Sequence, residues 1–267
     1  MASTLRPVRV HHLNCGSMFP AVIGRLVCHV LLCELDDRLV LVDTGFGLSD
    51  VADPAGRLGV SRRLLAARLD PAETAIRQVE ALGFAATDVR DIVLTHFDLD
   101  HVGGLADFPH AAVHVTAAEW AAANHPLRRE RSRYRPAQWA HGPKIVTHEP
   151  AGERWEGLLA RPLDELDGAL ALVSLPGHTR GHAAVAVDGP DGWLLHAGDA
   201  YFHRAVLGDR AGRTARTALG LGAFEHLVAA DVRKLSRNHD VLAELRRRFP
   251  VFCAHDPVEL DRYTGKV

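Results

Sequence analysis

Runs of apolar and β-branched residues recur along the chain and predict buried strands. Their length of five to seven residues, bounded by turn-forming residues, favours strands over helices. They occupy residues 89–95, 111–115, 169–175, 183–187 and 251–255. Residues 26–45 contain two more such runs around an Asp36-Asp37 pair, and this arrangement predicts a β-hairpin.

Other segments have the periodicity of amphipathic helices. Their apolar residues recur every three to four positions, as expected when one helix face is buried. These segments are residues 58–69, 71–83 and 223–248. Thr116 followed by Glu119 has the pattern of a capping box and indicates one more helix start. Because strands and helices alternate without a repeat or a linker, we expect one α/β domain over residues 1–267.

Composition narrows the class of protein. With 267 residues and 47% hydrophobic residues, the chain can bury a large core. A net charge of −2 argues against a nucleic-acid binder, and the absence of an 18-residue apolar stretch argues against a membrane span. Four cysteines without a Cys-x-x-Cys pair indicate reduced core residues. We therefore expect a cytoplasmic protein acting on a small molecule, with its oligomeric state left open.

The strand predicted at residues 89–95 is followed by the densest group of potential metal ligands. His96, Asp98, Asp100 and His101 fall within six positions, and a Gly103-Gly104 pair follows them. Such charge density at a strand end costs stability through repulsion and desolvation unless a cation compensates it. The sequence therefore predicts a metal site here.

Three later apolar runs also stop at potential ligands. Residues 169–175 precede His178 and His182, residues 193–197 precede Asp199, and residues 251–254 precede His255. A strand fixes the position of the residue that follows it, at the end of the strand. Potential ligands that follow several strands in this way therefore indicate one shared site.

These motifs together resemble the metallo-β-lactamase superfamily. The matching elements are Thr-His-x-Asp-x-Asp-His-x-Gly-Gly from Thr95, Pro-Gly-His-Thr-x-Gly-His from Pro176, Gly198-Asp199, a late His255, and the earlier Asp43-Thr-Gly turn. In length and spacing the chain is most similar to acyl-homoserine lactonases and glyoxalase II-like hydrolases. The resemblance implies a four-layer αβ/βα sandwich of the metallo-β-lactamase type, with two metal ions at one edge of its two sheets.

The resemblance also implies a role for each ligand. Three groups are expected: site one with His96, Asp98 and His178; site two with Asp100, His101 and His255; and Asp199 with a hydroxide as the bridges between them. Asp43 and His182 are expected to support these ligands through hydrogen bonds.

Asp98 departs from the family pattern, which usually has His at this position. With two divalent ions, three carboxylates and a hydroxide, the formal charge of the site falls to zero instead of plus one. Oxygen ligands shift metal preference toward iron or manganese, although zinc tolerates them. The flavodiiron branch carries a Glu here and uses iron. We expect two divalent ions, zinc first, with iron or manganese as alternatives because of Asp98.

The expected chemistry is hydrolysis of an ester, lactone or thioester by a metal-bridging hydroxide. Asp100 is expected to orient that hydroxide and to move a proton. Lactonases place a Tyr three residues after the bridging Asp, where this chain has Phe202. We therefore expect Tyr201 or His203, and not Phe202, to donate a hydrogen bond to the substrate.

A segment at about residues 119–150 interrupts the α/β alternation and is a candidate cap over the metals. It carries five arginines between positions 128 and 135. One interpretation is a solvated basic loop. The other is a cover that attracts an anionic or carbonyl-rich substrate.

Three other functions stay open on the sequence. They are a diiron redox enzyme of the flavodiiron type, a phosphodiesterase, and a non-catalytic binding or sensor protein on the same fold. Asp98 favours the first, but the chain has no flavin-binding or rubredoxin-like segment.

Overall fold

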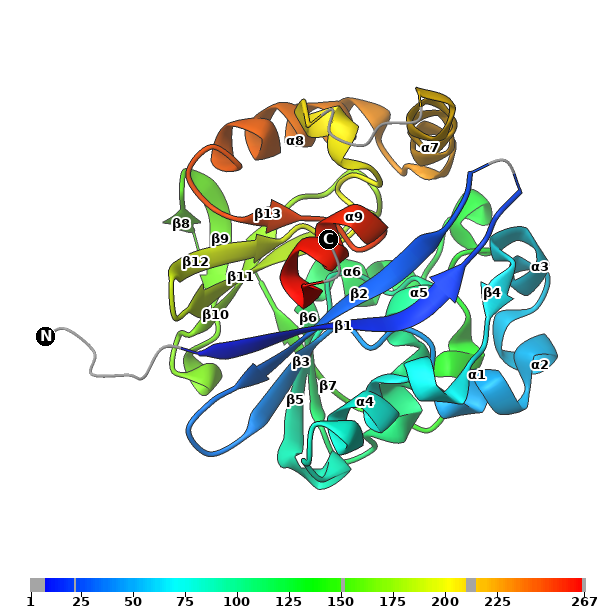
Figure 1. Cartoon of the computed structure of the whole chain (residues 1–267), viewed down its shortest axis with the longest axis vertical. Helices are drawn as coiled ribbons and strands as arrows, with labels where there is room; N and C mark the ends of the chain where they lie inside the picture. The colour runs from blue at the N-terminus through cyan, green and yellow to red at the C-terminus, as the bar shows by residue number, and fades with distance from the viewer. Residues whose placement is uncertain (1–7, 22, 150–151, 210–214, 266–267) are drawn as a thin grey trace, which may run out of the picture.

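Two mixed β-sheets pack face to face, with helices on both outer faces (Figure 1). The structure is a computed structural model that describes residues 8–21, 23–149, 152–209 and 215–265. Its layers run helix, sheet, sheet, helix. The four-layer αβ/βα sandwich expected from the sequence is therefore confirmed.

The first sheet has seven strands in the order β4-β1-β2-β3-β5-β6-β7. Their bounds are β1 (Arg9–Met18), β2 (Leu26–Glu34), β3 (Leu39–Val42), β4 (Ala67–Arg68), β5 (Val89–Val93), β6 (Ala112–Thr116) and β7 (Lys144–His148). The predicted hairpin is confirmed, because β2 and β3 pair antiparallel across the Asp36-Asp37 turn. Strands β3, β5, β6 and β7 then run parallel.

The second sheet has six strands in the order β13-β12-β11-β10-β9-β8. Their bounds are β8 (Glu153–Trp155), β9 (Leu158–Pro162), β10 (Leu170–Ser174), β11 (Ala183–Gly189), β12 (Gly192–His196) and β13 (Val251–Phe252). Neighbours pair antiparallel except β12 and β13, which are parallel. The carboxyl ends of β12 and β13 consequently lie at the same edge of the sheet.

Helices complete the outer layers. The α-helices are α1 (Leu48–Ala52), α2 (Pro54–Leu58), α3 (Ser61–Leu65), α4 (Ala75–Ala81), α5 (Leu99–Val102), α6 (Ala117–Asn124), α7 (Ala215–Val228), α8 (Val232–Leu245) and α9 (Pro257–Thr264). The 3₁₀ turns are η1 (Pro71–Glu73), η2 (Ala86–Asp88), η3 (Gly103–Asp107), η4 (Arg128–Glu130), η5 (Pro136–Gln138), η6 (Asp164–Leu166) and η7 (Arg204–Leu207). Helices α4 and α6 cover the first sheet, and α8 covers the second.

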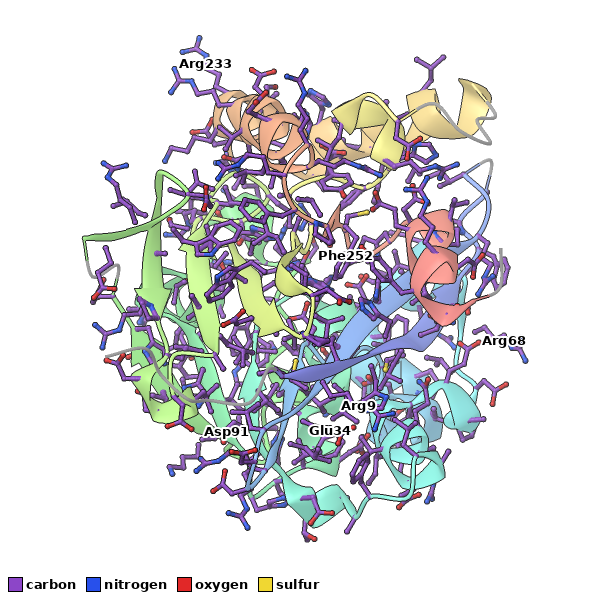
Figure 2. All side chains as sticks on the ribbon, turned by 60° about the vertical axis from the view of Figure 1, so that its left-hand side comes forward. Arg9, Glu34, Arg68, Asp91, Arg233 and Phe252 are labelled. Carbon is purple, nitrogen blue, oxygen red and sulfur yellow. The ribbon has the colours of Figure 1, made fainter. Side chains whose placement is uncertain are left out.

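The inner core lies between the sheets. Val42 and Val93 of the first sheet belong to one buried cluster with Leu172, Val185 and Phe252 of the second. In the side-chain view Phe252 lies in the interior (Figure 2). Each sheet is covered by the other sheet on one face and by helices on the other. Successive residues of a strand are therefore buried on both faces, which explains the unbroken apolar runs in the sequence.

The helix predictions were correct in part. A helix over residues 58–69 is wrong, because α3 ends at Leu65. The next residue, Ala66, has a left-handed φ of 45°, and the chain then forms β4. The helix predicted over 71–83 starts later, because Thr74 is extended and separates η1 from α4. The pattern at 223–248 is two helices, with the Asp231 carboxylate capping the second.

Two expectations from composition also have structural counterparts. All four cysteines are buried free thiols. Within the described ranges, no helix combines the length and the apolarity needed to cross a membrane.

Backbone hydrogen bonds join the two sheets at one edge. The amide of Ala183, at the start of β11, donates to the carbonyl of Thr95 at 3.0 Å. The amide of His29 in β2 donates to the carbonyl of Ala254 at 2.9 Å. The ends of β5, β10, β12 and β13 therefore meet, and the segments that follow them share one site.

Candidate metal centre

The structure brings together all seven side chains that the sequence analysis named as ligands. They form two neighbouring groups: His96, Asp98, His178 and Asp199; and Asp100, His101 and His255. In each group the donor atoms lie within 4.8 Å of one another. Helix α5 starts immediately after Asp98, and its first turn carries Asp100 and His101. This start explains how six consecutive positions can face two groups at once.

The Asp199 carboxylate lies between the two groups. Its Oδ2 is 3.6 Å from His96 Nε2 and 3.3 Å from His178 Nε2. Its Oδ1 is 3.3 Å from His101 Nε2 and 3.1 Å from His255 Nε2. Donor atoms about 2.1 Å from one shared zinc ion lie roughly 3.4 Å apart in a tetrahedral site. The spacing therefore matches ligands around two ions with one bridging carboxylate.

Several atoms of these groups are buried without a hydrogen-bond partner. They are His96 Nε2, His101 Nε2, Asp98 Oδ1 and Asp199 Oδ1. A buried polar atom without a partner costs about 1–3 kcal/mol, so native proteins rarely hold several in one place. Metal ions would supply the missing partner of each atom. The residues present therefore fit a dinuclear centre.

Asp43 orients two of the imidazoles. Its Oδ2 lies 2.8 Å from His101 Nδ1 and accepts from the Thr95 hydroxyl at 2.8 Å. The Thr95 oxygen lies 2.9 Å from His96 Nδ1, and since its proton goes to Asp43 it accepts from the imidazole. Both imidazoles therefore carry their proton on Nδ1 and direct the Nε2 lone pair into the site. His255 is oriented in the same way by the carbonyl of Val27, 2.8 Å from its Nδ1.

His182 lies behind the ligands. Its Nδ1 is 3.1 Å from the Leu175 carbonyl, and its Nε2 accepts from the Asp199 backbone amide at 3.0 Å. It therefore holds the backbone of the bridging residue. Gly198 permits this contact, because its φ is 54° and a Cβ there would lie 2.7 Å from His182 Nε2.

Glu119 connects the two segments that carry site one, a role the sequence analysis missed. Its buried carboxylate accepts from Phe97 N at 3.0 Å and Gly181 N at 3.2 Å, and from the hydroxyl of Thr179 at 2.6 Å. Thr116 does cap α6 by accepting from Glu119 N. The carboxylate does not complete the predicted capping box but fixes the backbone between the ligands.

The electrostatic field of the groups favours added positive charge. Burial opposes protonation of His255, yet Asp199 outweighs it and raises the pKa of His255 to about 9. In the same way burial opposes protonation of His101, but Asp199 and Asp43 raise its pKa well above the usual value. A field that favours protons on these imidazoles also favours cations.

Comparison with known proteins agrees with this geometry. A model of the metallo-β-lactamase superfamily matches residues 23–239, which include every predicted ligand except His255. The chain belongs to the metallo-β-lactamase superfamily. A probable metallo-hydrolase of Mycobacterium tuberculosis is 54% identical over 257 residues, which cover 94% of this chain and 81% of that protein.

Members named as lactonases are more distant. An N-acyl homoserine lactonase of Rhizobium johnstonii is 30% identical over 157 residues, 57% of this chain and 56% of that protein. A solved N-acyl homoserine lactone hydrolase, with N-hexanoyl-L-homoserine at its catalytic metal centre, superposes with a TM-score of 0.69 at 17% identity. The superposition covers 97% of both chains, and at this identity it supports the fold alone.

Within this superfamily site, Arg133 is a second residue that the sequence analysis did not single out. It comes from the arginine-rich segment between α6 and β7. Its Nη1 donates to Asp98 Oδ2 at 3.0 Å and lies 2.9 Å from His178 Nε2. Burial acts against the charge, but Arg133 and His96 hold the pKa of Asp98 well below its usual range.

The segment is packed only in part, because Arg128, Arg129 and Arg131 are exposed. Arg135 donates to the carbonyls of Gly56 and Arg57, while Tyr134 and Trp139 are buried. Residues 144–148 are the edge strand β7 and continue the first sheet. A cap over residues 119–150 as a separate unit stays a prediction.

Tyr201 does not face the ligands, so the structure gives no support to its expected contact with substrate. Its hydroxyl donates to Glu259 at 3.0 Å and 3.2 Å, and its ring is buried in the core under α8. Neighbouring residues point in opposite directions, and it is Phe202 that faces the site. The Phe202 ring centroid is 5.5 Å from that of His178 and 5.3 Å from that of His255.

A cavity of about 140 Å³ opens beside the second ligand group. Five of its ten lining residues are apolar and five are polar or charged: Leu26, Phe202, Leu221, Pro257 and Val258; and Arg25, His203, Arg204, His255 and Asp256. His203 is on this wall and caps η7 by accepting from Ala205 N through Nδ1. It therefore stays a candidate for contact with substrate.

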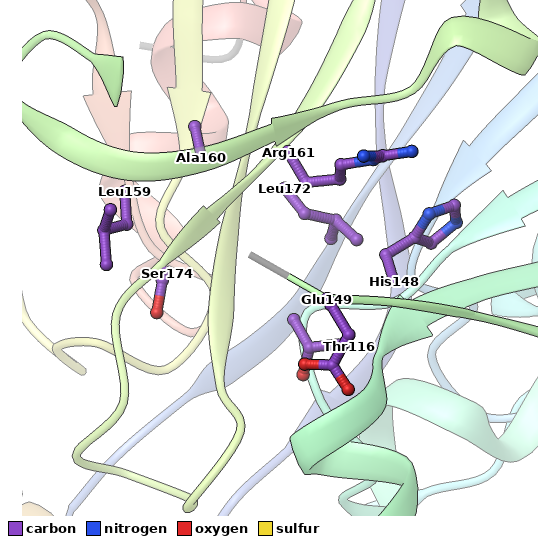
Figure 3. Close-up of a pocket in the computed structure, with 8 residues that line it drawn as sticks. All are labelled: Thr116, His148, Glu149, Leu159, Ala160, Arg161, Leu172 and Ser174. Atoms are coloured by element: carbon purple, nitrogen blue, oxygen red, sulfur yellow. The ribbon is translucent and has the colours of Figure 1, made fainter. Parts of the chain in front are cut away.

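A third group of potential ligands lies away from this centre. His114, His148 and Glu165 could also surround an ion. However, His114 Nδ1 is 3.0 Å from His148 Nε2, and His114 Nε2 is 2.9 Å from Asp91. These ring nitrogens already have partners. Arg161 and His148 line the same cavity (Figure 3). We assign no metal there.

Proposed function

We propose that this protein is a metal-dependent hydrolase that cleaves an ester, lactone or thioester bond in a small molecule. Two divalent ions would be held by His96, Asp98 and His178 on one side and by Asp100, His101 and His255 on the other, with Asp199 between them. When bound, such ions supply a hydroxide at neutral pH and polarise a carbonyl oxygen.

The observation that carries this proposal is the position of Asp199. Its Oδ2 faces His96 and His178, its Oδ1 faces His101, and His255 Nε2 lies near both oxygens, at donor spacings suited to metal coordination. A carboxylate surrounded by four imidazoles could also form an ion-pair cluster that binds no metal. His96 Nε2 argues against that reading, because it lies 3.5 Å from Asp98 Oδ2 and 3.6 Å from Asp199 Oδ2, so a proton there would have no hydrogen-bond partner.

The surrounding residues suit hydrolysis of a carbonyl compound. Asp100 is 11% exposed and is in a position to accept the proton of the attacking water and to return it to the leaving group. Phe202 and the apolar cavity wall exclude bulk water from one side and offer space to an apolar part of the substrate. The relatives named as metallo-hydrolases and N-acyl homoserine lactonases support the same class of reaction.

Zinc is our first choice of metal, because four imidazoles suit it well. Three carboxylates in the same set leave iron and manganese open. Growth-medium supplementation with each metal, followed by elemental analysis, would separate these choices.

A substrate panel tests the proposal. The metal-loaded protein should hydrolyse at least one lactone, ester or thioester, lose that activity in chelator, and regain it when zinc, iron or manganese is restored. Phosphodiesters serve as the comparison class. Cleavage of phosphodiesters alone, or no turnover with two ions bound, would overturn the proposed function.

A further inference from the structure

Arg133 reaches the candidate metal centre from a segment that otherwise lies outside it. Its side chain is 12% exposed, and Nη1 lies within 3.0 Å of one atom each from Asp98 and His178. Its Nη2 donates to the carbonyl of Val228. Burying a guanidinium is costly unless an anion faces it, and Asp98 is that anion.

The five N–H donors of this guanidinium outnumber the three acceptors that contact it, even before a metal binds. The three acceptors are Asp98 Oδ2, His178 Nε2 and the Val228 carbonyl. Under the proposed function, the Nε2 lone pair of His178 binds an ion and cannot accept a hydrogen bond. An ion on that lone pair would take the place of Nη1, which lies 2.9 Å from Nε2. The guanidinium would then withdraw from His178, while its hydrogen bond to Asp98 Oδ2 keeps its remaining N–H groups beside site one.

The other side chains expected to meet a substrate oxygen do not supply such a donor here. Tyr201 is turned into the core, and Phe202, which faces the imidazoles, has no hydrogen-bonding group. His203 lies on the cavity wall beside the second ligand group, not the first. Among the described residues that contact the ligands of site one, Arg133 is the cationic donor.

We propose that Arg133 donates a hydrogen bond to the carbonyl oxygen of the substrate and to the oxyanion formed from it, and that Asp98 positions it. This inference rests on the proposed function. Asp98 lowers the formal charge of the metal site by one relative to the usual His, and the guanidinium restores it. Asp98 thus has two roles: it is a metal ligand, and it holds Arg133 where Arg133 can contact the substrate.

Arg133→Met tests the substrate contact. A preorganised donor at a developing oxyanion is worth roughly 10²-fold or more in kcat. We expect the variant to keep its metal content, to lose that factor in kcat, and to bind hexanoate, a carboxylate probe, at least tenfold more weakly in calorimetry. The matched control is Arg129→Met: Arg129 donates to the nearby carbonyl of Ala230 and contacts no predicted ligand.

Asp98→His tests the anchor. In that background Arg133 has lost its partner, so removing Arg133 should cost much less in kcat and hexanoate affinity than it does in the wild type. Equal costs in both backgrounds would show that Asp98 does not position Arg133.

Hexanoate binding to the metal-loaded protein also separates this inference from the proposed function. If no carbonyl substrate is turned over, weaker hexanoate binding in Arg133→Met still supports the contact. If Arg133→Met has unchanged kcat and hexanoate affinity, the proposed substrate contact is overturned. If the variant loses its metal, the contact is also overturned, in favour of a structural role for Arg133. If Arg133→Met does not fold, Arg133→Lys replaces it, because Lys retains the charge without the planar pair of donors. The kcat and the hexanoate affinity of Arg133→Lys then test the substrate contact.

Discussion

Replacing Glu119 with Gln removes one acceptor oxygen from the buried carboxylate that connects the ligand segments. Four donors meet that carboxylate: Phe97 N and the Tyr134 hydroxyl on one oxygen, and Gly181 N and the Thr179 hydroxyl on the other. The two hydroxyls can turn and accept from a new amide. The two backbone amides cannot, so either orientation of the Gln amide leaves one N–H unpaired.

The magnitude follows from this count. An unpaired buried N–H costs about 1–3 kcal/mol, and bonds to a neutral acceptor are about 1 kcal/mol weaker than those to a charged one. We expect Glu119→Gln to lower the free energy of unfolding by roughly 2–4 kcal/mol. For a chain of this size that is a fall of roughly 5–10 °C in melting temperature.

The variant should also bind metal more weakly. Phe97 lies between the predicted ligands His96 and Asp98, and Gly181 lies between His178 and His182. Loss of such a support typically costs 10–100-fold in metal affinity, about the effect we expect here. Metal competition titrations measure the affinity, and melting of the metal-free proteins measures stability without a contribution from the ion.

Asp50→Asn is the control. Asp50 is also a buried carboxylate, accepting from Gly47 N, Arg57 and Gln138, and none of these partners is a predicted ligand or a chain neighbour of one. It should lose stability and keep its metal affinity. If Glu119→Gln loses stability and binds metal as tightly as the wild type, Glu119 supports the fold only and the reasoning fails.

Three further predictions follow from single contacts. Tyr201→Phe removes a buried hydrogen bond to Glu259 and should cost about 1 kcal/mol of stability, measured by melting, while a lower kcat would contradict our placement of Tyr201. Burial raises the pKa of Asp107 to about 6. The folded state then binds this proton more tightly than the unfolded state, so the free energy of unfolding should fall as pH rises from about 4 to about 6. Asp107→Asn should reduce this pH dependence in urea titrations, and an unchanged dependence would exclude Asp107 as its source. Chelator should lower the melting temperature, because an ion at 100 times its Kd adds about 2.7 kcal/mol, and identical curves with and without chelator would exclude bound metal.

The ligand set could be predicted from the sequence because each ligand follows an apolar strand. The runs before His96, His178 and His255 gave local signals, and parallel or paired strands that end at one edge bring distant residues together. The role of the Asp43-Thr-Gly turn was predicted from the resemblance to the superfamily.

The supporting contacts could not be predicted because they depend on loop paths without periodicity. Glu119 has the local pattern of a helix cap, and only the approach of the 179–181 backbone gives its carboxylate another role. Arg133 was one of five arginines in a segment, and the sequence does not reveal which one turns inward. The unusual Asp98 was the available signal, since an added buried carboxylate calls for a cation beside it.

The metal content of the purified protein tests the central claim most directly. Elemental analysis of protein prepared without chelator should find close to two divalent ions per chain, and Asp199→Ala should lose at least one of them, because its carboxylate lies between both ligand groups. A wild-type chain that stays free of metal after incubation with zinc, iron and manganese, or an Asp199→Ala variant with full occupancy, would contradict the account.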